Sequence, residues 1–248
     1  MPRGRITKEE SVAFLERYKS ESYVISESND LIQKTSYNLP LQQQRIILYG
    51  ISMIKPDDTE LKDLTFDIKD FCDTCGITYN ANNYKYLRKA VESLAKQVFW
   101  MDEENGDKVL CHWINNAIIH AGSTKITIRF DDYLKPHLIQ LRKNFTALEK
   151  CMIRMKSQYS PRLYALLKSY YNIGVVRFSV EELRGKMKLE KEYAEYKYFK
   201  RDIIEKAIKE INEITSIYVE YEEVKDYRKT TEIIFKIKHF TERKIERD

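Results

Sequence analysis

The sequence predicts an α+β protein built from two tandem copies of one small unit. The stretch YKYLRK at residues 84–89 reappears as YKYFKR at residues 196–201, and 196 − 84 = 112. The preceding stretch repeats at the same offset, since FDIKDF at 66–71 corresponds to FSVEEL at 178–183. Apolar positions agree as well as charged ones, because Ile77 corresponds to Leu189 and Cys75 to Met187. An internal duplication therefore explains the pattern better than chance similarity between Lys- and Tyr-rich helices.

Each copy has the element order of a helix-turn-helix whose recognition helix comes last. A short strand, a short helix and a turn precede a long helix with a basic first turn. In the first copy, apolar runs at 99–101 and 109–114 flank Asn105-Gly106, which is a β-hairpin signal. In the second copy, alternating runs at 217–221 and 231–237 flank the basic turn 225–229. A hairpin after the long helix predicts two tandem winged-helix domains.

The first copy begins after a less regular N-terminal region. We expect a helix at 9–19, a strand at 23–25 and a short helix at 31–37. Pro40 then starts a clear helix at 41–54. A strand at 64–68 leads into a short helix that Gly76 ends. Asn80 to Asn83 can cap the long helix, and the strands at 118–119 and 126–130 complete the copy.

The domain boundary is expected near residues 131–145, with domains at 1–140 and 141–248. Asp131-Asp132 caps a helix through Leu141 just before it. Because Gly and Ser are scarce here, the two domains should pack together without a free tether. The second copy then supplies a strand at 175–180, a short helix at 181–187 and a long helix at 196–211. A charged tail follows His239.

Composition describes a globular chain with a mild excess of positive charge. Of the 248 residues, 43% are hydrophobic and 33% charged, and the net charge is +5. Such a balance permits nucleic-acid binding without demanding it. No apolar run reaches the ~20 residues that span a bilayer, and residues 1–20 lack the apolar core of a signal peptide. We therefore expect a cytoplasmic protein with reduced cysteines and no membrane partner.

Candidate DNA contacts lie on the two long helices, on the second wing and in a basic region between the copies. Residues 142–168 contain seven cationic residues and one acid, Glu149. Within this region, Ser160 is a natural N-cap with Pro161 at the first helical position, and hydroxyls and cations there suit phosphate. A solvated helix face with a good cap is the alternative. The expected contacts are Tyr84, Lys85, Arg88, Lys89, Lys143, Lys156, Ser157, Tyr159, Ser160, Arg162, Tyr196, Lys197, Lys200, Arg201 and Arg228.

Two rankings follow within this set. Tyr84 and Tyr196 are expected to lie nearer DNA, with Tyr86 and Tyr198 nearer the core. The second long helix has the more basic surroundings, so we expect Lys200 and Arg201 to carry more base specificity than the first helix.

The sequence gives little support for an enzymatic or a metal-binding function. The seven glycines are isolated, so no phosphate-binding loop is present. No His-x-His pair supplies the metal site of a rolling-circle nickase, although one of 18 tyrosines could still be a nucleophile. Cys72-x-x-Cys75 followed by Cys111-His112 could indicate a zinc site. The correspondence of Cys75 to Met187 in the second copy instead favours a packing role for these cysteines. We expect no cofactor, no metal and no catalysis.

From about Leu39 to Lys238 the chain resembles the plasmid replication initiator (Rep) proteins that bind iterons. The motifs are LRKNFT at 141–146, KSQYSPRLYALLKSY at 156–170, AIKEIN at 207–212, FCDTCG at 71–76 and FW at 99–100. Ala165 stands where family sequences often have Glu. The resemblance implies binding to direct repeats at an origin, recruitment of host replication proteins in a bacterium, and repression of the protein's own gene by a dimer on an inverted repeat. A transcriptional repressor without an initiator role is the alternative.

Self-association needs a surface of its own. From the sequence, we expect apolar β structure at 114–128 in the first copy that has no counterpart in the second copy. We expect this region to form the dimer interface by strand pairing or sheet packing.

Overall fold

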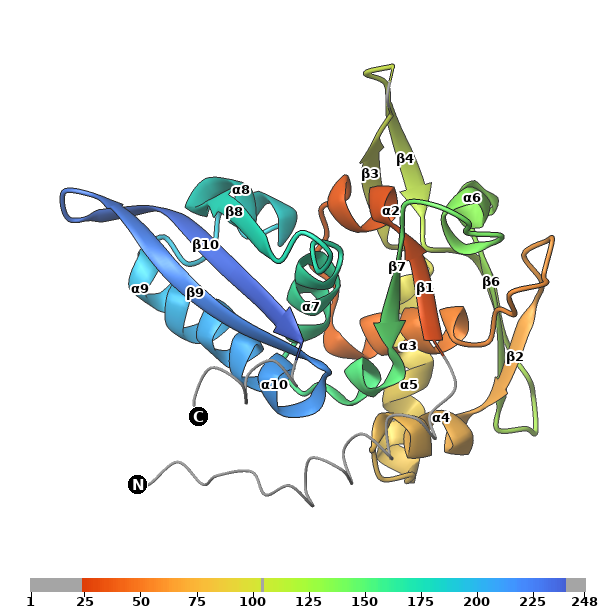
Figure 1. The fold of residues 1–248 in the computed structure, drawn as a ribbon. Coiled ribbons are helices and arrows are strands. Elements are labelled where there is room, and N and C mark those ends of the chain that lie inside the picture. The colour runs from red at the N-terminus through yellow and green to blue at the C-terminus, as the bar shows by residue number, and fades with distance from the viewer. Residues whose placement is uncertain (1–23, 104, 240–248) are drawn as a thin grey trace.

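A computed structural model describes residues 24–103 and 105–239 of the chain (Figure 1). It consists of two winged-helix units that lie side by side, with helix α7 between them. The predicted α+β class with two tandem winged-helix domains is confirmed. The helix expected at 9–19 and the tail after His239 lie outside the described residues.

The first unit has a three-stranded antiparallel sheet of order β2-β6-β5 and two separate two-stranded sheets, β1-β7 and β3-β4. Its elements are β1 (Val24–Ser28), α2 (Asn29–Gln33), α3 (Leu41–Ile51), β2 (Leu64–Asp67), α4 (Ile68–Cys75), α5 (Ala81–Leu94), β3 (Val98–Asp102), β4 (Lys108–His112), β5 (Ile114–Ile119), β6 (Lys125–Phe130), the 3₁₀ turn η1 (Asp132–Leu134), α6 (Lys135–Leu138), β7 (Phe145–Glu149) and the 3₁₀ turn η2 (Lys150–Arg154).

The second unit has one three-stranded antiparallel sheet of order β8-β10-β9. Its long helix is a single rod in which a π-helical turn separates two α-helical parts. The elements are α7 (Ser160–Lys168), β8 (Val175–Ser179), α8 (Val180–Lys186), α9 (Tyr196–Phe199), the π turn η3 (Lys200–Glu205), α10 (Lys206–Ile214), β9 (Ile217–Asp226) and β10 (Lys229–His239).

The two units repeat each other down to the helix caps. In both sheets the last strand lies in the middle, between the first strand and its own hairpin partner. Asp67 and Ser179, which are 112 residues apart, each cap the following short helix through a side-chain oxygen. Cys75 and Met187 are both buried at the ends of those helices. The interpretation of Cys75 as a packing residue therefore agrees with the structure. Burial also raises the pKa of its thiol to about 12, which disfavours the thiolate form that binds zinc.

The wing of the first unit is β5–β6, not the hairpin at Asn105-Gly106. Strand β6 pairs with both β2 and β5, just as β10 pairs with both β8 and β9. The hairpin β3–β4 is an addition between the long helix and the wing, and it projects from the first unit (Figure 1). Residues 114–128 are thus the counterpart of the second wing, so the expectation that they are extra β structure was wrong. The prediction was wrong because two consecutive hairpins have the same alternating hydrophobic pattern in sequence.

Strand pairing also contradicts the boundary expected at residue 140. Strand β7 begins at Phe145 and pairs along its whole length with β1, from Ser28–Phe145 to Val24–Glu149. The first unit therefore extends at least to Glu149. No flexible linker follows, as expected, because η2 and α7 pack directly into the junction.

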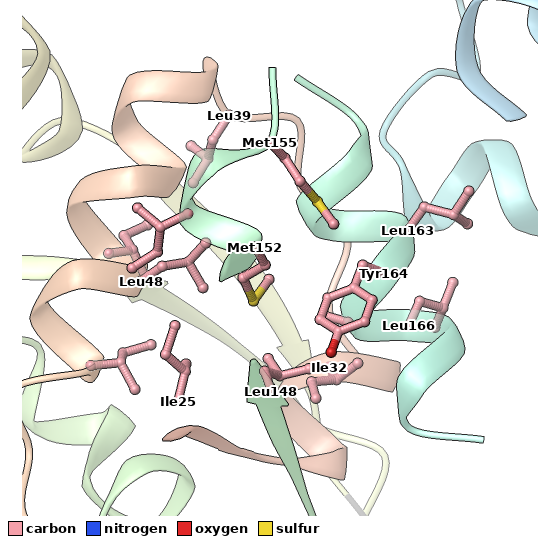
Figure 2. Packing of buried hydrophobic residues seen from close by; sticks show 14 of the residues in the cluster. Ile25, Ile32, Leu39, Leu48, Leu148, Met152, Met155, Leu163, Tyr164 and Leu166 are labelled. Carbon is pink, nitrogen blue, oxygen red and sulfur yellow. The ribbon is translucent and has the colours of Figure 1, made fainter. Parts of the chain in front are cut away.

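The junction has an apolar core drawn from both sides of α7. Figure 2 shows Met152 and Met155 between α3 and α7, with Leu148 and Tyr164 beside them. All four side chains are almost completely buried. Flexible methionines fill irregular gaps, which suits a place where a short 3₁₀ turn meets two helices. The two units are therefore joined by a packed interior.

Arg162 in α7 belongs to this interior. Its guanidinium donates to the Thr35 carbonyl oxygen at 2.7 Å and lies 4.4 Å from the centre of the Tyr37 ring. The nearby carboxyl of Glu27 is fully buried, and this burial raises its pKa to about 7, an effect that the Arg162 charge opposes. Arg162 thus stabilises the ionised form of a buried acid.

We predict that Arg162→Ala destabilises the fold, and more so at higher pH. Loss of the bond to Thr35 leaves a buried carbonyl unsatisfied, at a cost of ~1–3 kcal/mol. Glu27 has a raised pKa when folded, so its contribution to stability is present below pH 4.5 and is lost as pH rises through about 7. Without Arg162 this pKa rises further, so the deficit in unfolding free energy should grow between pH 5.5 and pH 8.

Urea unfolding at both pH values measures this deficit, with the exposed Lys143→Ala as a control. An equal deficit at the two pH values would contradict the coupling between Arg162 and Glu27.

Candidate nucleic-acid interface

The first long helix, α5, presents a continuous cationic face. Asn80 caps it by accepting a hydrogen bond from the Asn83 N–H at 2.8 Å. Leu87, Val91 and Leu94 point into the core, which turns the opposite face to solvent. Lys85, Arg88 and Lys89 are exposed on that face and form no ion pair with any residue that the structure describes. Their charges are free to meet phosphates or base edges.

The second long helix presents its cations differently, because each has an acidic partner. Lys197 pairs with Glu195 at 2.7 Å. Lys200 turns toward the wing, where it pairs with Glu223 of β9 at 2.6 Å. Arg201 holds Asp202 through two bonds, Nε to Oδ1 at 3.0 Å and Nη2 to Oδ2 at 2.6 Å.

These pairs assign different roles to Lys200 and Arg201. Tyr196 donates to the same Glu223 carboxylate at 3.1 Å, so Lys200 and Tyr196 together fasten the helix to its wing. The Arg201 guanidinium lies 5.1 Å from the Tyr198 ring centre, and its Nη1 is left outside the Asp202 pair. Asp202 therefore fixes the plane of an exposed guanidinium, and Arg201 can approach a base without first being ordered. Arg201 and Lys200 lie in the π turn, an irregularity often found at functional sites.

The ranking of the tyrosines was wrong in both units. Tyr84 is half-buried beside the core, and Tyr196 is bonded to Glu223. Tyr86 and Tyr198 are the exposed members, at 54% and 38%. Each exposed tyrosine precedes by one residue a side chain of the inward stripe, Leu87 or Phe199, so it lies beyond the edge of the buried face.

The second wing carries a basic tip, as predicted. Strands β9 and β10 extend to Asp226 and Lys229, which leaves Tyr227 and Arg228 as the turn. Tyr227 is 98% exposed and has a positive φ of 52°, and Arg228 is exposed beside it. The tip of the first wing, between β5 and β6, contains Gly122 with a φ of 67°. The second tip alone combines a cation with an aromatic ring, which suits contact with a DNA backbone.

The expected phosphate site before α7 is only partly at the surface. Lys156 is exposed, and the backbone N–H groups of Lys156 and Ser157 both donate to Glu210 of α10, at 2.5 and 3.1 Å. Tyr159 is half-buried against Tyr193, and burial raises the pKa of its phenol. An acid already occupies the donors that would have met a phosphate.

Ser160 and Arg162 cannot make the surface contacts expected of them. Ser160 is fully buried and lies inside the helix, whose N-cap is Tyr159, so the predicted Ser160 cap is wrong. Arg162 is committed to Thr35 in the junction. Helix α7 is buried on nearly all sides, so its cations are structural. Lys143 is exposed in the loop whose Asn144 carbonyl accepts from the Asn29 N–H, at the start of α2.

Sequence reasoning missed two acids that organise the site. Asp202 and Glu223 hold Arg201 and Lys200, and these cations lower the pKa of both carboxyls. Asp202 follows Arg201 directly, which was a visible signal. The role of Glu223 could not be predicted from the sequence, because only the strand register brings it beneath Lys200.

Among the described residues, no helix is long and apolar enough to cross a bilayer. Within the same residues, no three His, Cys, Asp or Glu side chains converge as ligands for a metal ion.

Comparisons with known proteins agree with this geometry. The chain is 31% identical to the PI protein of Escherichia coli over 110 residues, which take in 38% of this chain and 35% of that protein. The chain thus matches about a third of the length of this curated relative. Its structure superposes on that of the Pi initiator protein in complex with iteron DNA with a TM-score of 0.73, at 21% identity, over 88% of this chain and 97% of the other. Domains 2 and 3 of RctB superpose with a TM-score of 0.50 at 13% identity, over 80% of this chain and 81% of theirs.

Family models match most of the chain, one for each unit. The model described as "Initiator Replication protein, WH1" matches residues 24–168, and the one described as "Initiator Rep protein, WH2" matches residues 179–237. The first match continues through α7, so the family models place the boundary after residue 168, well beyond residue 140. The chain belongs to the family of initiator replication (Rep) proteins.

Proposed function

We propose that this protein initiates plasmid replication by binding directly repeated DNA sites at an origin. The observation that carries the proposal is the pair of exposed basic helices, α5 and α9–η3, on two duplicated winged units packed without a flexible linker. In such units the long helix enters the major groove and the wing meets the backbone. The superposition on an initiator solved with iteron DNA supports the same use of the fold.

The mechanism that follows is binding and distortion of DNA, without catalysis by this chain. Lys85, Lys89, Lys197 and Arg228 supply charge for phosphates, which sets affinity and salt dependence. Arg88 and Arg201 have the planar donors that pair with guanine. Host replication proteins would then be recruited to the opened origin, and we place the protein in the bacterial cytoplasm with the plasmid.

Replication supplied in trans tests the initiator role. A plasmid that carries the origin but lacks the gene should replicate only when the protein is expressed from a second plasmid. A repressor of the same fold would bind the same DNA and silence a reporter, yet leave that plasmid unreplicated. Strand cleavage of supercoiled origin DNA by the protein with a divalent metal would instead indicate a nickase.

Binding-site selection is predicted to separate the reading residues from the phosphate contacts. Arg201→Ala should relax the preference at one base position, with a loss of roughly tenfold or more against the best site, because a bidentate base contact disappears. Arg88→Ala should relax a different position to a smaller extent. Lys85→Ala should leave the preference unchanged and lower the log–log salt slope by about 0.9.

Lys209→Ala is the matched control, since this lysine is exposed on the α10 surface and pairs with Glu213. If Arg88→Ala abolishes preference while Arg201→Ala retains it, the first unit is the principal reader. If neither variant alters preference, these helices do not read the sequence.

We propose that self-association uses the outer face of the β3–β4 hairpin, in place of the region 114–128 that the sequence suggested, because the latter forms the first wing. Val98, Trp100 and Leu110 are 43%, 51% and 48% exposed, and Trp100 lies opposite Leu110 across the strands. An exposed apolar sheet face of this kind favours packing against a second copy. Trp100→Lys with Leu110→Lys should convert a dimer to a monomer in light scattering and abolish repression at an inverted repeat.

The control is Ile173→Lys, which alters an exposed apolar side chain in the second unit. A dimer that survives the double change would place the interface elsewhere.

A further inference from the structure

Two buried or half-buried carboxylates join the second unit to the first. Glu149, at the end of β7, has a side chain that is only 5% exposed. It accepts from the Ser216 N–H at 2.8 Å and from the Ser216 hydroxyl, in the turn between α10 and β9. The same carboxylate accepts from the Tyr164 hydroxyl at 2.9 Å and lies 3.4 Å from Lys168 Nζ, both in α7. One side chain therefore ties a strand of the first unit to the end of the second reading helix.

Glu210 makes the reciprocal connection from the second unit. It lies on α10 and accepts from two successive backbone N–H groups, those of Lys156 and Ser157. The segment that carries these groups is itself held by α3 of the first unit. Arg45 donates to the carbonyls of Ile153 and Met155 at 3.0 and 2.8 Å, and Gln44 donates to that of Gln158 at 2.7 Å.

A continuous series of packed helices and hydrogen bonds thus connects the two long helices. Helix α5 packs on α3, and side chains of α3 donate hydrogen bonds to carbonyl groups within residues 153–158. Glu210 joins this segment to one turn of α10, and Glu149 fixes the end of the same helix. Two attachment points along a rod determine its direction as well as its position. Helix α10 continues without a break into η3 and α9, so the fixed direction is transmitted to Arg201.

We propose that Glu149 and Glu210 are positioning residues that set the separation and rotation of the two reading helices, and hence the spacing between the two half-sites that one chain recognises. The inference rests on the proposed DNA-reading function. Both acids lie in the junction, where Glu149 bonds to the Ser216 N–H of the second unit and Glu210 bonds to two N–H groups of the connecting segment. Their effect on DNA passes through the geometry of the helices, without contact with a base or phosphate.

Glutamine tests this role with little change in size. A carboxylate can accept from both N–H groups that face Glu210, whereas an amide places its own donor against one of them. Glu210 is half-buried, so Glu210→Gln should remain folded, and thermal melting by circular dichroism verifies it. Glu149→Gln is the second variant, and the exposed Glu213→Gln on the same helix is the matched control.

The measurement compares two duplexes, the selected site and the same site with one base pair inserted between its halves. The insertion rotates the second half-site by roughly 34° and shifts it by about 3.4 Å. Wild type and Glu213→Gln should bind the inserted duplex at least about tenfold more weakly. For Glu210→Gln this ratio should fall below about threefold, with weaker binding to the selected site and unchanged base preference within each half.

A wild-type spacing ratio in folded Glu210→Gln would overturn the inference and leave the proposed function standing. Loss of base preference within the half-sites would also overturn it, because the acid would then support the reading helix itself. If wild type shows no preference among duplexes at all, the proposed function fails, and the inference fails with it.

Discussion

The architecture depends on which side chains form hydrogen bonds with the backbone of residues 150–159. This segment has no strand partner, and its one regular element is a short 3₁₀ turn, so side chains serve as partners for its buried carbonyls and for its N–H groups nearer the surface. Arg45 and Gln44 from the first unit take the carbonyls, while Glu210 from the second takes the N–H groups. Leaving the buried carbonyls without partners would be costly, so the bonds from α3 hold the segment against the first unit. The bonds from Glu210 attach the same segment to the second unit, and the two units are joined through it.

Duplication explains why the two units look alike, and divergence explains why their long helices present their cations differently. The capping residues Asp67 and Ser179 preserve the entry into each short helix. The first long helix leaves its cations unpaired among the described residues, whereas the second neutralises each of its cations with an acid. Free cations bind any phosphate backbone, but a guanidinium held in plane favours one edge of one base. Under the proposed function, the first unit would supply affinity and the second would supply discrimination.

Much of the fold was predictable from the sequence, because local signals determine it. The apolar stripes of α5 and α10, the turn at Gly76 and the second wing all appear as periodic patterns with their usual end residues. The role of α7 was not predictable. Seven cations within residues 142–168 predicted a phosphate-binding surface, yet Arg162 and Ser160 are buried, and Arg162 is bonded to the distant Thr35. The wing assignment failed for a related reason, since hydrophobic alternation shows that strands exist but not which strand each one pairs with.

Hydroxyl-radical footprinting on one direct repeat, at a protein concentration where the chain is monomeric, tests the central claim most directly. A single rigid chain with two reading helices should protect two patches about 10 bp apart on the same face of the duplex, and the pattern should lack two-fold symmetry. Both patches should appear together as protein is added, because one body makes both contacts. A single patch, or two patches that fill at clearly different concentrations, would contradict the account.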